Sequence, residues 1–344
     1  MSAQKIFSAL LSAAGLIIFI LDGKTALIGA SEGITLCLNT LIPSLFPFLF
    51  FCSILTNALW GEQFRWIASI THRLGIPHGG ESLLISALLG GYPAGALAIG
   101  KAFDENRLTK NDACHLLTFC NNAGPAFLFG MAIHLFPNHS SVWMLWIIQT
   151  VSSAITGIMG HYHPIEKSTF SKKSNSISQI LEKTVYTMSL ICGWVLLFQI
   201  VSKFLNRWIL WYFPKSIQII ITGLLEISSG FCLLTDISSI PARFLVCTCF
   251  LSFGGLCVTM QTASVIGALP LKYYLKGKLM HFTISMLIAF FYLKLGWIFP
   301  VIITILTFGF LIYPKKEVDF CQYPMYNDSI IMWRKQNNAV SQKN

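Results

Sequence analysis

Charged residues are scarce in this chain: only 11% of its 344 residues are Asp, Glu, Lys or Arg, whereas 54% are hydrophobic. So little charge excludes an ordinary soluble domain, in which about a quarter of the residues are charged. The long apolar runs instead predict an all-α polytopic membrane protein embedded in the lipid bilayer.

Patterns of metal binding and catalysis are also missing. The ten cysteines contain no C-x-x-C pair, so we expect reduced thiols and no metal site. Neither a phosphate-binding loop nor an H-E-x-x-H motif occurs, so we expect no enzyme and no cofactor. The net charge of +10 arises from Lys and Arg between apolar runs and in the tail, which excludes a typical nucleic-acid patch.

Apolar runs long enough to cross a core of ~30 Å lie near 4–21, 34–60, 113–136, 141–161, 180–206, 243–267, 279–295 and 297–313. Two further apolar stretches, 81–103 and 216–240, are interrupted midway and could either cross or fold back as re-entrant hairpins. Two hairpins place 18 Lys and Arg residues inside and 6 outside, whereas two crossings give 14 and 10. The positive-inside rule therefore favours about eight transmembrane helices plus two re-entrant hairpins, with both termini cytoplasmic.

The order of segments repeats along the chain: a long span, an interrupted stretch, a Gly-interrupted span and a plain span. The Gly-interrupted span contains FCNNAGPAF in the first copy and FGGLCVTMQ in the second. Three true crossings per unit would turn the second copy upside down, which predicts the inverted repeat of many secondary transporters. The expected divisions are an N-terminal transmembrane helix and loop (1–33), a first repeat (34–163), a cytoplasmic linker (164–179), a second repeat (180–295), a last transmembrane helix (296–314) and a polar tail (315–344).

The first interrupted stretch carries Gly91, Tyr92, Pro93 and Gly95 at its centre. Proline removes a backbone donor and disfavours helical geometry in the residue before it, so the helix should break here. Irregular backbone at membrane depth survives only inside protein or beside water, and such breaks often mark a transport site. We therefore predict a substrate-lining tip, with close packing of small residues as the alternative.

The next span is interrupted at Asn121, Asn122, Gly124 and Pro125. Adjacent amides in an apolar span are costly unless they are paired. Their donors and acceptors suit a carboxylate, a ring nitrogen or a nucleobase edge equally well. They are predicted to bind substrate, and hydrogen bonds between helices are the alternative.

The second interrupted stretch contains Glu226, followed by Ser228, Ser229 and Gly230. These last three residues are predicted to bind substrate together with the first two breaks. An intramembrane carboxylate is a functional candidate by default, so Glu226 could bind a coupling H⁺ or Na⁺, or pair with a helix end. Lys101 ends the first hairpin and is expected to anchor it at the interface. No Lys or Arg lies inside either hairpin, so a bound carboxylate would be neutralised by free N–H groups at helix N termini.

Two motifs carry a resemblance to a known family: GGYPAGA (90–96) and LLTFCNNAGPAFLFG (116–130), joined by a charged connector. They resemble the sporulation integral membrane protein family (YlbJ or SpoVV type), whose members carry a nucleoside-recognition, or Gate, domain. The family motif usually reads S-G-Y-P-x-G, and here Gly90 replaces the serine.

The resemblance implies that the substrate is dipicolinic acid, delivered to the forespore during sporulation across the outer forespore membrane. It also implies a fold related to concentrative nucleoside transporters. Two other functions remain open, namely transport of a nucleoside or nucleobase and a non-transporting sporulation membrane scaffold. The expected partner is a small-molecule substrate, and self-association into a homo-oligomer is left open.

Overall fold

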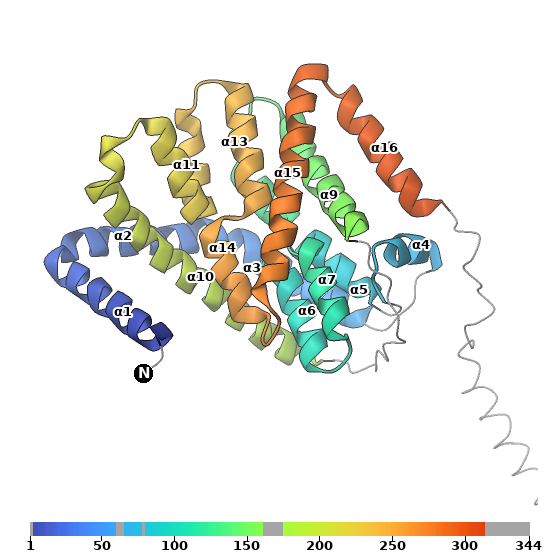
Figure 1. Cartoon of the computed structure of the whole chain (residues 1–344), viewed down its shortest axis with the longest axis horizontal. Helices are drawn as coiled ribbons and strands as arrows, with labels where there is room; N and C mark the ends of the chain where they lie inside the picture. Colours follow the sequence, from blue (N-terminus) through green and yellow to red (C-terminus); the bar gives the residue numbers. More distant parts are fainter. Residues whose placement is uncertain (1–2, 60–64, 78–79, 161–174, 314–344) are drawn as a thin grey trace, which may run out of the picture.

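The computed structural model describes residues 3–59, 65–77, 80–160 and 175–313, and every regular element in them is a helix (Figure 1). Five of these helices are long and apolar enough to cross a membrane: Gly23–Ala58, His139–Met159, Ile177–Trp208, Ile240–Val265 and Leu271–Leu295. Shorter apolar helices cover Ser12–Leu21, Glu81–Gly90, Lys215–Leu225 and Ile298–Ile312. The prediction of an all-α chain is confirmed for the described residues, and the five long helices support several membrane crossings.

The N-terminal region differs from the expected helix and loop. After α1 (Ala3–Leu21), residues 23–33 belong to α2 (Gly23–Leu36), which continues through one π-helical turn, η1 (Cys37–Leu41), into α3 (Ile42–Ala58). The carboxylate of Asp22 caps α2 by accepting from the backbone N–H of Thr25 at 3.3 Å. The predicted loop is therefore wrong, because tertiary packing overrides the weak helix propensity of its glycines.

Gly29 and Gly33 lie where α2 packs against α10 (Ile177–Trp208). A Cβ on Gly29 would lie 2.8 Å from the Cα of Ile200 in α10, so only glycine permits the two helices to approach this closely. The segment 29–33 also has the G-x-S-x-G spacing of a hydrolase nucleophile turn. Here the backbone is continuous helix and Ser31 is exposed, so the spacing serves helix packing.

Both halves of the chain contain short helices separated by breaks. The first half continues with α4 (Arg65–Arg73), α5 (Glu81–Ile85), η2 (Ser86–Gly90), α6 (Ala94–Asp104), α7 (Lys110–Phe119), α8 (Pro125–Ala132) and α9 (His139–Met159). The second half contains α10, η3 (Leu210–Tyr212), α11 (Lys215–Leu225), α12 (Ile227–Leu233), η4 (Leu234–Asp236), α13 (Ile240–Phe253), α14 (Gly255–Val265) and α15 (Leu271–Leu295), and α16 (Ile298–Ile312) follows. Helices therefore break at all four places where the sequence predicted an interruption.

Each interrupted stretch folds into a hairpin whose two arms touch. In the first, a Cβ on Gly95 of α6 would lie 3.5 Å from the Cα of Ala87 in η2. In the second, Gly230 of α12 packs against the backbone of Gly223 in α11, and Lys215 pairs with Asp236 at 3.3 Å across the open end. The two arms of each interrupted stretch therefore pack against each other.

The two hairpins open toward opposite ends of the molecule. At what we call the linker end, a ring nitrogen of His115 lies 2.8 Å from the carbonyl oxygen of Leu74, and Asn175 donates its backbone N–H to the side-chain oxygen of Asn57 at 3.0 Å. At the far end, Arg243 donates to the carbonyl of Leu135 at 2.6 Å. In Figure 1, α6 and α7 accordingly lie low in the view, while α11 and α13 lie at the top.

Two of the predicted divisions lie wholly or mostly outside the residues that the structure describes. Most of the expected linker, residues 164–174, and the expected tail, residues 315–344, lie outside the described residues. The last residues of the predicted linker begin α10, where Ser176 and Gln179 form a reciprocal capping box. The second repeat therefore starts about three residues before the predicted boundary.

The hairpin arrangement predicts which connectors share a side of the membrane. With the exposed Cys232 and the tail Cys321 changed to Ser, Lys110→Cys at the linker end should resist a membrane-impermeant maleimide added to intact cells, whereas Ser238→Cys at the far end should react. Permeabilised cells provide the control for reactivity. Labelling of both positions from outside would contradict two hairpins that open toward opposite ends.

Candidate functional site

The first two breaks meet backbone to backbone. Gly91 has a φ of 68°, in the left-handed region that favours glycine, and its Cα faces Gly124. A Cβ on Gly124 would lie 2.9 Å from the Cα of Gly91, and a Cβ on Gly95 would collide with the carbonyl of Cys120. The predicted residues Gly91, Gly95 and Gly124 are thus brought together, and no other residue type fits this contact.

Asn121 links the first hairpin to the second half of the chain. Its side-chain oxygen accepts from the backbone N–H of Ala96 at 3.4 Å, and its amide nitrogen donates to the hydroxyl of Thr262 in α14 at 2.8 Å. Only 1% of Asn121 is exposed. The amide is therefore paired within the protein, as the alternative of hydrogen bonds between helices expects.

Asn122 is the centre of a second buried network. Its amide nitrogen donates to the carbonyl of Phe119 at 2.6 Å and to the hydroxyl of Ser153 at 2.9 Å. Its side-chain oxygen accepts from the ammonium of Lys278 at 3.0 Å. Because Lys278 is only 4% exposed, the predicted amide holds a deeply buried cation.

The sequence analysis did not single out Lys278, because this residue lies just before the predicted apolar run 279–295. Tyr274, Lys278, His281 and Ser285 recur on one face of α15 at helical spacing, and all four are buried. This polar stripe in an otherwise apolar helix was the available signal. The expectation that the site lacks a buried cation is therefore wrong.

The surroundings of Lys278 are neutral in the part of the chain that the structure describes. No carboxylate there lies within ion-pair distance of the ammonium, and the rings of Tyr92 and Tyr274 lie 5.6 and 5.7 Å from it. The hydroxyl of Tyr92 is buried and has no hydrogen-bond partner among these residues. The centre of the site thus holds a lysine amino group without a counter-charge among the described residues, and an unused polar group.

The third break is joined to the others by aromatic contacts. Tyr92 lies 5.9 Å from Phe127 of α8, and Phe127 lies 5.7 Å from Phe231 of α12, measured between ring centroids. Pro125 begins α8 directly after Gly124, where a missing N–H costs nothing. The helices that start at the second and third breaks therefore pack against each other beside the first.

Glu226 caps α12. Its carboxylate accepts from the backbone N–H groups of Ser228 and Ser229 at 2.9 and 2.7 Å, and from the hydroxyl of Ser229 at 2.6 Å. This is the helix-end pairing that the sequence analysis considered beside a coupling role. The N–H groups of this helix start are therefore occupied, while Gly230 serves the contact between the hairpin arms.

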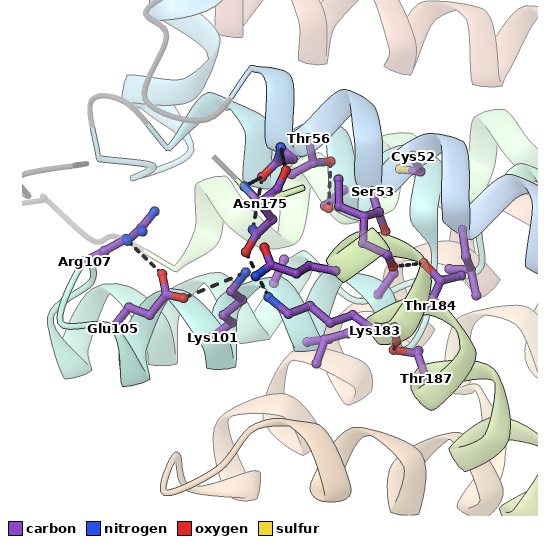
Figure 2. Close-up of a pocket in the computed structure, with 18 residues that line it drawn as sticks. Cys52, Ser53, Thr56, Lys101, Glu105, Arg107, Asn175, Lys183, Thr184 and Thr187 are labelled. Carbon is purple, nitrogen blue, oxygen red and sulfur yellow. Dashed lines mark hydrogen bonds and ion pairs between the residues drawn. The ribbon is translucent and has the colours of Figure 1, made fainter. Parts of the chain in front are cut away.

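A cavity of about 470 Å³ opens between α3, α6 and α10 at the linker end (Figure 2). Polar and charged side chains make up much of its lining: Ser53, Thr56, Asn57, Ser86, Lys101, Glu105, Arg107, Asn175, Gln179, Lys183, Thr184 and Thr187. Because Ser86 and Ala94 also line it, the cavity reaches the two arms of the first hairpin beside its tip. Lys101, which we expected to anchor the hairpin at the interface, points into this space.

The contact between Gly91 and Gly124 predicts how a substitution changes the stability of the protein. Gly91→Ala should destabilise the protein by at least about 1–3 kcal/mol, because alanine is strained at this φ and its methyl group would collide with Gly124. Gly193→Ala is the matched control, since nothing lies within 4 Å of an added Cβ there. Thermal unfolding of both variants in detergent checks this. Equal midpoints would show that the two breaks do not depend on this contact.

Comparisons with known proteins give one similarity. No protein-family model matches the chain, and no solved structure matches it. Among curated proteins, the chain is similar to the sporulation integral membrane protein YlbJ of Bacillus subtilis (strain 168), with 22% identity over 295 residues, which is 71% of each chain. This similarity supports the family suggested by the two motifs, at the level of a sporulation membrane protein.

Proposed function

We propose that this protein is a membrane transporter of a small planar carboxylate, and that the carboxylate is dipicolinic acid, delivered to the forespore across its outer membrane. The proposal includes eight crossings, two re-entrant hairpins and both termini on the cytoplasmic side. It includes no enzymatic activity. The similarity to a sporulation membrane protein supports the cellular setting.

The observation that carries the proposal is the buried ammonium of Lys278. A charge in a membrane interior is costly unless it is paired, and such residues mark substrate or ion pathways. Lys278 is held by one neutral acceptor, Asn122, directly beside the helix that begins at the second break. A substrate carboxylate would supply the missing negative charge, so the site gains most from an anion.

Nucleoside transport and a scaffold role explain the buried lysine less well than carboxylate transport does. A nucleoside is neutral and would leave the ammonium uncompensated, although Asn122 and Tyr92 could still bind its base. A scaffold needs no buried cation. Glu226 remains our candidate for a coupling ion, and binding an ion there would have to compete with its three hydrogen bonds to the start of α12.

The role of Lys278 can be tested by uptake into proteoliposomes. Lys278→Met keeps the apolar stem but removes the charge, so dipicolinate uptake should fall at least about tenfold. Lys278→Arg should retain part of it. Uridine is offered in parallel. Unchanged dipicolinate uptake in Lys278→Met would reject the carboxylate site, and uridine uptake by the wild type would favour the nucleoside function.

Asn122 provides a second test because its side-chain oxygen lies 3.0 Å from the ammonium. Asn122→Asp should form an ion pair with Lys278 and neutralise the cation that a substrate needs, whereas Asn122→Ala leaves the cation in place. We therefore expect a much larger loss of dipicolinate uptake in Asn122→Asp. Equal losses in the two variants, at equal amounts of protein in the liposomes, would contradict the anion site.

A further inference from the structure

Two lysines meet at the mouth of the cavity in Figure 2. Lys101 extends from α6 and Lys183 from the first turns of α10, and their ammonium groups point toward each other. The two residues come from different halves of the chain, so only the tertiary structure brings them together. Like charges held at close range repel, and an anion between them removes that repulsion.

The neighbouring charges do not neutralise this pair. Glu105 is the sole carboxylate among the described residues that line the cavity, and it lies 2.9 Å from Arg107 but 3.8 Å from Lys101. Lys183 donates to the side-chain oxygen of Asn175 at 3.1 Å, which is a neutral partner. Among the described residues that line the cavity, three cationic side chains therefore accompany one acidic side chain, which is a surplus of positive charge.

The titration of Lys101 agrees with this geometry. Lys101 lies near the end of α6, outside the candidate membrane spans. Burial lowers its pKa to about 8, and the neighbouring Lys183 contributes in the same direction. A bound anion would oppose both effects by stabilising the charged form.

We propose that Lys101 and Lys183 form a carboxylate-binding site at the linker end, where the substrate is held before or after it passes the helix breaks. This inference rests on the proposed function, because it assigns the carboxylate to the transported molecule. The cavity volume of about 470 Å³ has room for a small aromatic dicarboxylate. One carboxylate would lie between the lysines, and the ring would extend along α6 toward Ala94.

Two sources could supply a ligand of this chemistry, a free carboxylate or the phosphate of an anionic lipid. The test uses the full-length protein in nanodiscs of neutral phosphatidylcholine and measures equilibrium binding of dipicolinate. Measured in the Lys278→Met background, so that the central site does not contribute, the Lys101→Gln/Lys183→Gln double variant should bind at least about tenfold more weakly than Lys278→Met alone. Lys110→Gln, an exposed lysine at the same end that does not line the cavity, should bind like the wild type.

A lipid arm and a folding control complete the design. Addition of phosphatidylglycerol to the nanodiscs should leave dipicolinate affinity unchanged. Loss of phosphatidylglycerol binding in the double variant, without loss of dipicolinate binding, would overturn the proposal in favour of a lipid site. The Lys101→Arg/Lys183→Arg variant keeps both charges and should restore binding, which separates lost charge from misfolding.

Failure of this inference can be told apart from failure of the proposed function. Lys278→Met should lower uptake at least about tenfold and leave equilibrium binding at the mouth intact, whereas the double Gln variant should raise the KM of uptake. Normal uptake with unchanged binding and KM in the double variant would reject the lysine pair and leave the transporter standing. Binding in the wild type that depends on both lysines, without any uptake, would keep the site and reject the transporter.

Discussion

The need to satisfy backbone polar groups inside a membrane is the constraint on which this structure depends. Every helix break frees N–H and C=O groups that cost several kcal/mol each if they remain unpaired in lipid. Side chains at the breaks meet part of this need: the side-chain oxygen of Asn121 accepts from the backbone N–H of Ala96 in the first turn of α6. The same two breaks also pack closely, because Gly91 touches Gly124. At the third break, the carboxylate of Glu226 accepts from the backbone N–H groups of Ser228 and Ser229. The broken elements thus assemble into one buried centre.

The same centre explains the distribution of charge. A lysine deep in an apolar helix is tolerated because Asn122 accepts from it and two aromatic rings lie beside it. A second group of cations lines the cavity at the linker end. Positive charge at the mouth and at the centre would lower the free energy of a bound anion at both places. A neutral molecule would not gain this stabilisation.

The two halves of the chain are interlocked where they meet. Asn121 donates to Thr262, and Gly100 of α6 lies directly against the backbone at the end of α14. A rocking movement of one repeat against the other, as in many secondary transporters, would have to change these contacts. The cavity opens on one side of this seam, between the first hairpin and the start of the second half.

Sequence alone determined the membrane class, the helical content and the positions of the four breaks, because hydropathy and the backbone chemistry of Gly and Pro are local properties. It also determined that Asn121 and Asn122 need partners, since a buried amide cannot remain unpaired. It could not assign the loop-like residues 23–33 to a helix, because their glycines are stabilised by α10, about 170 residues away.

Only the tertiary structure decided which partners meet. Lys278 lies 156 residues from Asn122, and Lys183 lies 82 positions after Lys101, so no local pattern pairs them. From the sequence, Glu226 fitted the role of an ion ligand and that of a helix cap equally well. In the structure, its carboxylate oxygens accept hydrogen bonds from the start of α12. Charge pairing and hydrogen bonding act over a few ångströms in space, whatever the separation along the chain, and the fold alone fixes those distances.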